Sequence, residues 1–179
     1  MSVGACLSNR RVHGIAMLMF ATATLKMAPS LAADHLAADD VRAIAAATAA
    51  GKIDLSGKDM SGDDLTDLDL SGANLAGAKL SGANLHGVKL VGADLTSADL
   101  IKADLTFAWI IRANFTDAHL NGATMQTVVT STGMENTPEQ ATTFVRADLS
   151  DAMITVHFSF DDMRGANFSR AHMTVVMAN

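Results

Sequence analysis

The chain has 179 residues, 49% of them hydrophobic, which is enough for one domain with a sizeable core. It contains no Tyr, one Trp (Trp109) and 13 Gly, a bias that indicates internal repetition rather than an ordinary mixed core. The formal net charge of −6 argues against a protein that binds nucleic-acid phosphates, which requires clustered Lys and Arg, although solubility alone also accounts for an acidic chain.

Residues 1–33 are predicted to be a signal peptide. Arg10 and Arg11 form a basic start, Gly14–Leu25 is an apolar run, and small residues near Ala32-Ala33 suit cleavage. At a rise of about 1.5 Å per residue, a helix over this run is too short to cross a hydrocarbon layer of about 30 Å. We therefore expect Sec-type export, with the twin-arginine route as an alternative. The other alternative is a buried helix of the folded domain.

Cleavage near Ala33 changes both the charge and the cysteine content of the chain. It removes Arg10, Arg11, Lys26 and the single cysteine, Cys6, but no acidic residue, which leaves 10 basic and 19 acidic residues and a net charge of −9. A chain without thiols suits an oxidising compartment. We expect a periplasmic or secreted protein with no stable membrane anchor after the leader is removed.

Residues 34–52 are predicted to be a linker followed by a helix. The stretch Asp39–Ala50 has Asp39 and Asp40 as acidic N-cap residues, and Gly51 provides a stop. Its apolar positions are Val41, Ile44, Ala45 and Ala49.

Residues 53–125 repeat with a period of five. Each unit has a central apolar residue, and fifteen such residues follow one another in strict register: Leu55, Met60, Leu65, Leu70, Leu75, Leu80, Leu85, Leu90, Leu95, Leu100, Leu105, Ile110, Phe115, Leu120 and Met125. A helix would scatter a five-residue step around its circumference, and a continuous strand would send alternate units to opposite faces. Only a chain that bends after every unit keeps these side chains together. The period predicts a coil with the central residues inside.

Units such as ANLAG (73–77), ADLTS (93–97) and ADLIK (98–102) resemble the pentapeptide-repeat family. The resemblance covers roughly residues 53–178, apart from one interruption. It implies an all-β solenoid, a right-handed four-sided (quadrilateral) β-helix with four repeats in each coil. It also implies that the central residue and the residue two positions before it point inward. The second inward position is Ala in ten of the fifteen units, as a crowded axis requires.

The first coil departs from this pattern, because Ile53, Lys58, Asp63 and Leu68 occupy its second inward position. A closed interior would bury Lys58 and Asp63 at a high cost. We therefore expect the coil to be open at this end and covered by the 39–50 helix, since solenoids need capped ends.

Residues 126–146 carry no five-residue pattern, and Gly133, Pro138 and several polar residues predict a loop insertion. The loop either serves recognition or is a tolerated surface insertion. The pattern resumes over 147–179, with one residue deleted near Thr155. No capping helix follows Met173, and an open parallel edge can pair with another copy. Because some family members dimerise at this end, we expect a homodimer.

Four repeats per coil would stack equivalent residues of successive coils about 4.8 Å from one another. Three outward columns follow, in which acidic residues alternate with other types: Asp54, Asn74, Asp94 and Asn114; Asp59, Lys79, Asp99 and His119; and Asp69, Lys89 and Trp109. The simplest interpretation is a solvated, stabilising surface. The alternative, taken from gyrase-protecting family members, is a protein that binds gyrase as a DNA mimic, which requires an uncleaved leader.

Large apolar residues at outward positions predict a surface for an unknown protein partner. They are Val91, Ile101, Phe107, Trp109 and Ile111. Val91 and Ile111 are four repeats apart and should stack, with Trp109 alongside. Alternatively, the 126–146 loop folds back and covers them.

The C-terminal block concentrates His and Met residues. Met153 with His172 and His157 with Met177 form two pairs about four repeats apart, and such ligands suit Cu(I). This is a weak prediction of a metal site, because Met also fills cores readily. No sequence motif indicates catalysis or a cofactor. The sequence therefore predicts a non-catalytic, exported binding or scaffold protein; a gyrase-binding DNA mimic ranks second and a copper-binding protein third.

Overall fold

The computed structural model describes residues 35–48, 53–128, 130, 137–155 and 161–174, all of which belong to one compact unit, Ala32–Asn179. The predicted signal peptide lies outside the described residues. The elements are helix α1 (Ala38–Ala47), strand β1 (Thr124–Gln126), the short 3-10 helix η1 (Pro138–Gln140), strand β2 (Met153–Thr155) and strand β3 (His172–Thr174). No helix among the described residues is long and apolar enough to cross a membrane.

The described chain after residue 53 winds into stacked coils, each of which returns to its starting position after four repeats. Parallel bridges join Asp54 to Asn74, Asn74 to Asp94 and Asp94 to Asn114. Backbone hydrogen bonds run between the same coils; the Leu55 N–H, for example, donates to the Asn74 carbonyl at 2.8 Å. Four five-residue repeats therefore make one coil, and the prediction of an all-β solenoid is confirmed.

The central residues fill the interior of the coils. Each of the fifteen from Leu55 to Met125 is at most 1% exposed, and the Ala residues two positions before them are buried as well. A β-turn follows each central residue; the Ala73 N–H donates to the Leu70 carbonyl at 3.1 Å, and Gly72 between them has a φ of 68°. These turns are the bends that the five-residue period requires.

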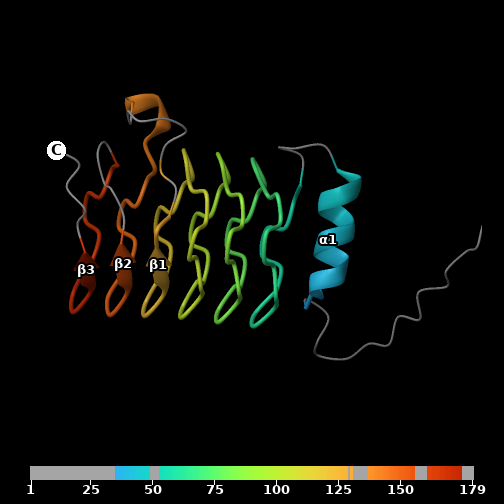
Figure 1. Cartoon of the computed structure of the whole chain (residues 1–179), viewed down its shortest axis with the longest axis horizontal. Helices are drawn as coiled ribbons and strands as arrows, with labels where there is room; N and C mark the ends of the chain where they lie inside the picture. Colours follow the sequence, from blue (N-terminus) through green and yellow to red (C-terminus); the bar gives the residue numbers. More distant parts are fainter. Residues whose placement is uncertain (1–34, 49–52, 129, 131–136, 156–160, 175–179) are drawn as a thin grey trace, which may run out of the picture. The chain divides into compact units, whose positions relative to one another are not determined.

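Later coils stack in the same way, but the number of residues between stacked positions changes. β1, β2 and β3 form a parallel sheet in that order, with Thr124 opposite Met153 and Met153 opposite His172 (Figure 1). The step from Thr124 to Met153 is longer than four repeats, because the insertion lies within it. The step from Met153 to His172 is one residue shorter than four repeats, which agrees with the predicted deletion near Thr155.

The insertion is shorter than the predicted 126–146 loop. Val128 and Thr130 are buried, and the coil resumes by Thr142, which is fully buried and donates its hydroxyl to the Ile110 carbonyl at 2.8 Å. Phe144 stacks on Phe115 with ring centroids 5.0 Å apart. The five-residue pattern is hard to recognise in the sequence here, because Thr142 occupies the inward position that is usually Ala. Residues 142–146 therefore belong to the second block of coils.

Helix α1 packs against the first coil. Val41 is fully buried, and Leu36, Ala38, Ile44 and Ala45 lie against the same core. Ahead of the helix, the Leu36 N–H donates to the Asp59 carbonyl, and Arg42 Nη2 donates to the Asp64 carbonyl at 2.6 Å. These contacts hold the helix against the first coil. Lys58 of that coil is exposed, so its charge is not buried in the interior.

Two details of the helix prediction were wrong. The N-cap is Ala37, which has no capping side chain, and Asp39 and Asp40 lie in the first turn instead. The helix ends at Ala47, before the predicted Ala50, and Thr48 is extended. Gly51 lies outside the described residues.

Candidate partner-binding surface

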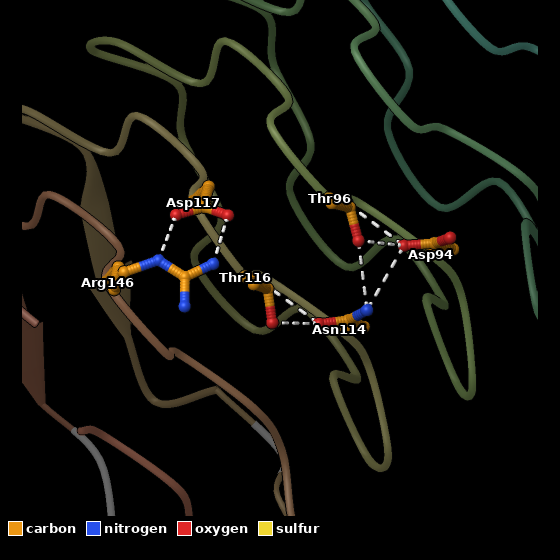
Figure 2. Close-up of polar contacts among 6 residues, drawn as sticks. All are labelled: Asp94, Thr96, Asn114, Thr116, Asp117 and Arg146. Carbon is orange, nitrogen blue, oxygen red and sulfur yellow. Dashed lines mark hydrogen bonds and ion pairs between the residues drawn. The ribbon is translucent and has the colours of Figure 1, made fainter. Parts of the chain in front are cut away.

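The outward columns of the coils are held by hydrogen bonds between their own side chains. In the column that begins at Asp54, an Asn amide donates to the Asp of the coil before it, at 3.1 Å from Asn74 to Asp54 and 3.3 Å from Asn114 to Asp94. Thr96 donates its hydroxyl to Asp94 at 2.5 Å, and Thr116 does the same to Asn114 at 2.6 Å (Figure 2). Alternation of Asp with Asn therefore avoids stacking like charges.

These contacts favour the ionised form of several Asp residues. The side-chain hydrogen bond with Ser56, followed by its backbone N–H, lowers the pKa of Asp54, and Thr66 lowers the pKa of Asp64 in the same way. On the corner between two faces, Arg146 donates from Nε to Asp117 at 2.6 Å and a second time from Nη2, which lowers the pKa of Asp117 (Figure 2). This ion pair joins the coils on either side of the insertion.

Two of the five predicted partner-binding residues are well exposed. Phe107 is 48% exposed and Trp109 is 40% exposed, whereas Val91 and Ile101 are partly buried. The His86 ring meets the Phe107 ring edge-on, with centroids 5.2 Å apart and planes at 78°. We call Phe107, Trp109 and His86 the aromatic surface.

Ile111 does not belong to an exposed surface, and its predicted exposure was wrong. It is only 2% exposed. The Arg112 N–H donates to the Gln140 carbonyl at 3.2 Å, which places η1 over this part of the coil. A crevice of about 330 Å³ remains here between η1 and the coil, lined by Val91, Ile111, Arg112, Thr137, Glu139 and Gln140. The alternative in which the insertion folds back is thus correct for Ile111 but not for Trp109.

Asp67, an acidic residue that the repeat pattern predicted to be part of a solvated face and not of the partner surface, lies on the same corner as Phe107. Asp67, Gly87, Phe107 and Thr127 occupy equivalent places in successive coils, linked by backbone hydrogen bonds such as that from the Asp67 N–H to the His86 carbonyl. A Cβ on Gly87 would lie 2.2 Å from Asp67 Oδ1, so the carboxylate fills the space above that glycine. In the sequence, counting back four repeats at a time from Phe107 leads to Gly87 and then to Asp67.

The His and Met residues are only partly described. Met153 lies opposite His172 in the register of β2 and β3, and both side chains are exposed. His157 and Met177 lie outside the described residues. Among the residues that the structure describes, no group of three or more His, Cys, Asp or Glu side chains is placed to hold a metal ion. The metal site stays a prediction.

Comparisons with known proteins agree with the repeat. The family model described as pentapeptide repeats matches residues 52–82, 78–117 and 98–127, with 8 copies. No curated protein matches the chain.

Solved structures similar to this chain include two pentapeptide-repeat proteins, Rfr23 and HetL. Rfr23 from the cyanobacterium Cyanothece 51142 is 20% identical, with a TM-score of 0.43, over 72% of this chain and 90% of that one. HetL from Nostoc sp. strain PCC 7120, involved in heterocyst differentiation regulation, is 17% identical with a TM-score of 0.29, over 77% and 95%. A trypsin-treated form of QnrB1, a plasmid-mediated fluoroquinolone resistance protein, is 15% identical with a TM-score of 0.26, over 68% and 79%.

The stacked five-residue repeats define the class of the protein as a β-solenoid. Over residues 52–127 the chain consists of repeats of the pentapeptide-repeat family.

Proposed function

We propose that this protein is an exported, non-catalytic binding protein whose aromatic surface contacts a protein partner. We further propose that its coils wind in a right-handed sense and that α1 serves as the N-terminal cap. The observation that carries the binding role is the exposure of Phe107 and Trp109 on coils whose other large apolar side chains lie mostly inside.

Without a partner, Phe107 is expected to lower the stability of the fold. Its φ of 60° is left-handed, a conformation that bulky residues adopt rarely, and the equivalent residue one coil earlier is Gly87. Burial does not compensate for this cost, because about half of the side chain is exposed. Contact with a partner would bury both aromatic side chains, and Trp is among the residues that contribute most to binding at interfaces.

Export supports a partner outside the cytoplasm. The proposal rests on the basic and apolar residues of the leader and on the loss of the only cysteine with it. Intact mass of the native protein, measured after cell fractionation, tests this part. We expect a periplasmic chain that starts near Ala33, and a full-length cytoplasmic chain would contradict export.

Retention of partners by two variants tests the binding role. We expect Trp109→Ala to lose a protein that co-purifies with the wild type, while its circular dichroism spectrum stays unchanged. The matched control is Met153→Ala, which removes a side chain that is 48% exposed on β2 and should keep the partner. Equal retention by both variants would contradict a partner at the aromatic surface.

Cu(I) binding is a second proposal, favoured by the adjacent and exposed Met153 and His172. Thioether and imidazole groups suit Cu(I). We expect the protein to retain stoichiometric Cu(I) and the paired change His157→Ala with His172→Ala to abolish retention. A wild-type protein that retains no stoichiometric copper would end this proposal.

Two other predictions are retained without change. A homodimer through the edge after β3 predicts twice the monomer mass in solution. The gyrase-binding alternative predicts inhibition of supercoiling by the full-length chain. It is less favoured because the acidic columns are diluted by Asn and Lys, as at Asn74 and Lys79.

A further inference from the structure

The Asp67 carboxylate is free of partners among the described residues. No hydrogen bond or ion pair to another described side chain engages it, although carboxylates nearby are engaged: Asp64 accepts from Thr66, and Asp69 lies 3.6 Å from Lys89 Nζ. The carboxylate is exposed and lies above Gly87, where any other residue would place a Cβ 2.2 Å from Oδ1. The corner therefore presents a negative charge that no described residue neutralises.

One aromatic ring follows this carboxylate along the same corner, two coils further on, and a second lies in the column of Asp69 and Lys89. Phe107 occupies the place after Gly87, one coil further on, and its ring meets the His86 ring edge-on. Trp109 comes two residues later in the chain and is 40% exposed. A carboxylate that shares a column with an exposed aromatic ring is a combination that attracts an organic cation, by charge and by the electron-rich ring face.

The charge of the surroundings selects a cation over an anion. Lys89, the cation in the column of Trp109, already lies beside Asp69. An anionic group would meet both Asp67 and Asp69 on a chain whose net charge is −6. A guanidinium fits better than an ammonium, because it stacks flat on an aromatic ring while donating two parallel hydrogen bonds to a carboxylate.

We infer that Asp67, Phe107 and Trp109 form a recognition site for a cationic side chain, an arginine, of the protein partner. This inference rests on the proposed binding function and names the chemistry of the partner. The guanidinium pairs with Asp67 and its planar face lies on Phe107, while the missing Cβ of Gly87 leaves room for the Asp67 carboxylate between them.

Trp109 fluorescence provides a direct test, because the chain has one Trp and no Tyr. The full chain is titrated with the blocked tripeptide acetyl-Gly-Arg-Gly-amide and, in parallel, with acetyl-Gly-Glu-Gly-amide. We expect a saturable change with the arginine peptide alone. Asp67→Asn should weaken its affinity by about fivefold, the upper range for an exposed ion pair. Phe107→Leu, which removes only the aromatic face, should weaken it too.

A matched control separates this site from general charge attraction. Asp40→Asn removes an exposed carboxylate from the first turn of α1 and should leave the affinity unchanged. The inference is overturned if the arginine peptide gives no saturable change, if the glutamate peptide binds equally, or if Asp67→Asn binds as tightly as the wild type. Circular dichroism of each variant confirms that it is folded.

The two proposals fail in different ways. If the arginine peptide does not bind but Trp109→Ala still loses the co-purifying partner, the cation site is wrong and the binding role stands. If Trp109→Ala also keeps the partner, both are wrong.

Discussion

The last residue of each five-residue repeat has a left-handed backbone whether or not it is glycine. In one corner column Gly82 has a φ of 67° and Lys102, its neighbour in the next coil, has a φ of 58°. Residues with a Cβ adopt this region at a cost of about 1–2 kcal/mol. The fold imposes this conformation through the turn, so each such residue other than glycine lowers stability.

Lys102→Gly should therefore stabilise the protein, by about 1 kcal/mol, because glycine adopts a left-handed φ without strain. Lys102 is exposed, and no ion pair engages it among the described residues. The measurement is the urea midpoint at constant slope. Lys102→Ala is the control and should leave stability unchanged, since Ala keeps the strain. A Lys102→Gly variant less stable than Lys102→Ala would contradict the strain argument.

The Asp residues of the outward columns predict a loss of stability in acid. The pKa of Asp54 lies below its ordinary value of 3.8, mainly because of the side-chain hydrogen bond with Ser56. A lowered pKa in the folded state stabilises the fold above the unfolded value, and this contribution disappears as pH falls through 3.8 and below.

Asp54→Asn should make stability less dependent on pH between 7 and about 3, because an amide keeps the acceptor oxygen but does not titrate. Asn74 already occupies the next place in this column, so the change fits the fold. Urea midpoints at the two pH values measure the effect. An acid-induced loss as large as that of the wild type would show that Asp54 does not contribute.

Helix α1 is the element that packs against the first coil. Val41 is the fully buried side chain of this helix, whereas Ala43 and Ala46 are exposed. Arg42 holds the helix to the coil through the Asp64 carbonyl. If the helix covers the end of the solenoid, losing its buried side chain should affect the whole fold.

Val41→Ala should lower the free energy of unfolding by about 2 kcal/mol, the value of roughly two buried methyl groups with a small cavity. Ala43→Ser changes an exposed position of the same helix and should alter stability by less than about 0.5 kcal/mol. Denaturant unfolding measures both. A Val41→Ala variant as stable as Ala43→Ser would mean that α1 does not protect the coil.

At the scale of the whole molecule, one ladder of central side chains holds the coils together. Leu85 is fully buried in the middle of it, and the next residue toward the N-terminus, Asn84, is exposed. A charge at position 85 would be buried without a partner, which costs several kcal/mol.

Leu85→Asp should therefore prevent folding, seen as loss of the native circular dichroism spectrum and of cooperative unfolding. Asn84→Asp adds the same charge one residue away, at an exposed position; it should lower stability, because it stacks an Asp between Asp64 and Asp104, but it should still fold. A folded Leu85→Asp protein would contradict the solenoid.

The five-residue period predicted the coil register and the outward columns, because each repeat meets the same neighbours one coil away. It did not predict the burial of Ile111, which depends on where the insertion folds. It also missed Thr142, since a Thr inside the coil needs the Ile110 carbonyl, a contact 32 residues away. Periodic contacts follow from local pattern, and contacts made by an insertion do not.

The central claim is that an exported form of this solenoid meets its partner at the aromatic surface. A photo-crosslinking residue placed at Thr127, beside Phe107 on the same corner, tests it in living cells; Ser97, an exposed corner residue of another column, is the control. We expect an adduct from position 127 alone, in the periplasmic fraction, on a chain that starts near Ala33. Equal adducts from both positions, or an adduct on the full-length cytoplasmic chain, would contradict it.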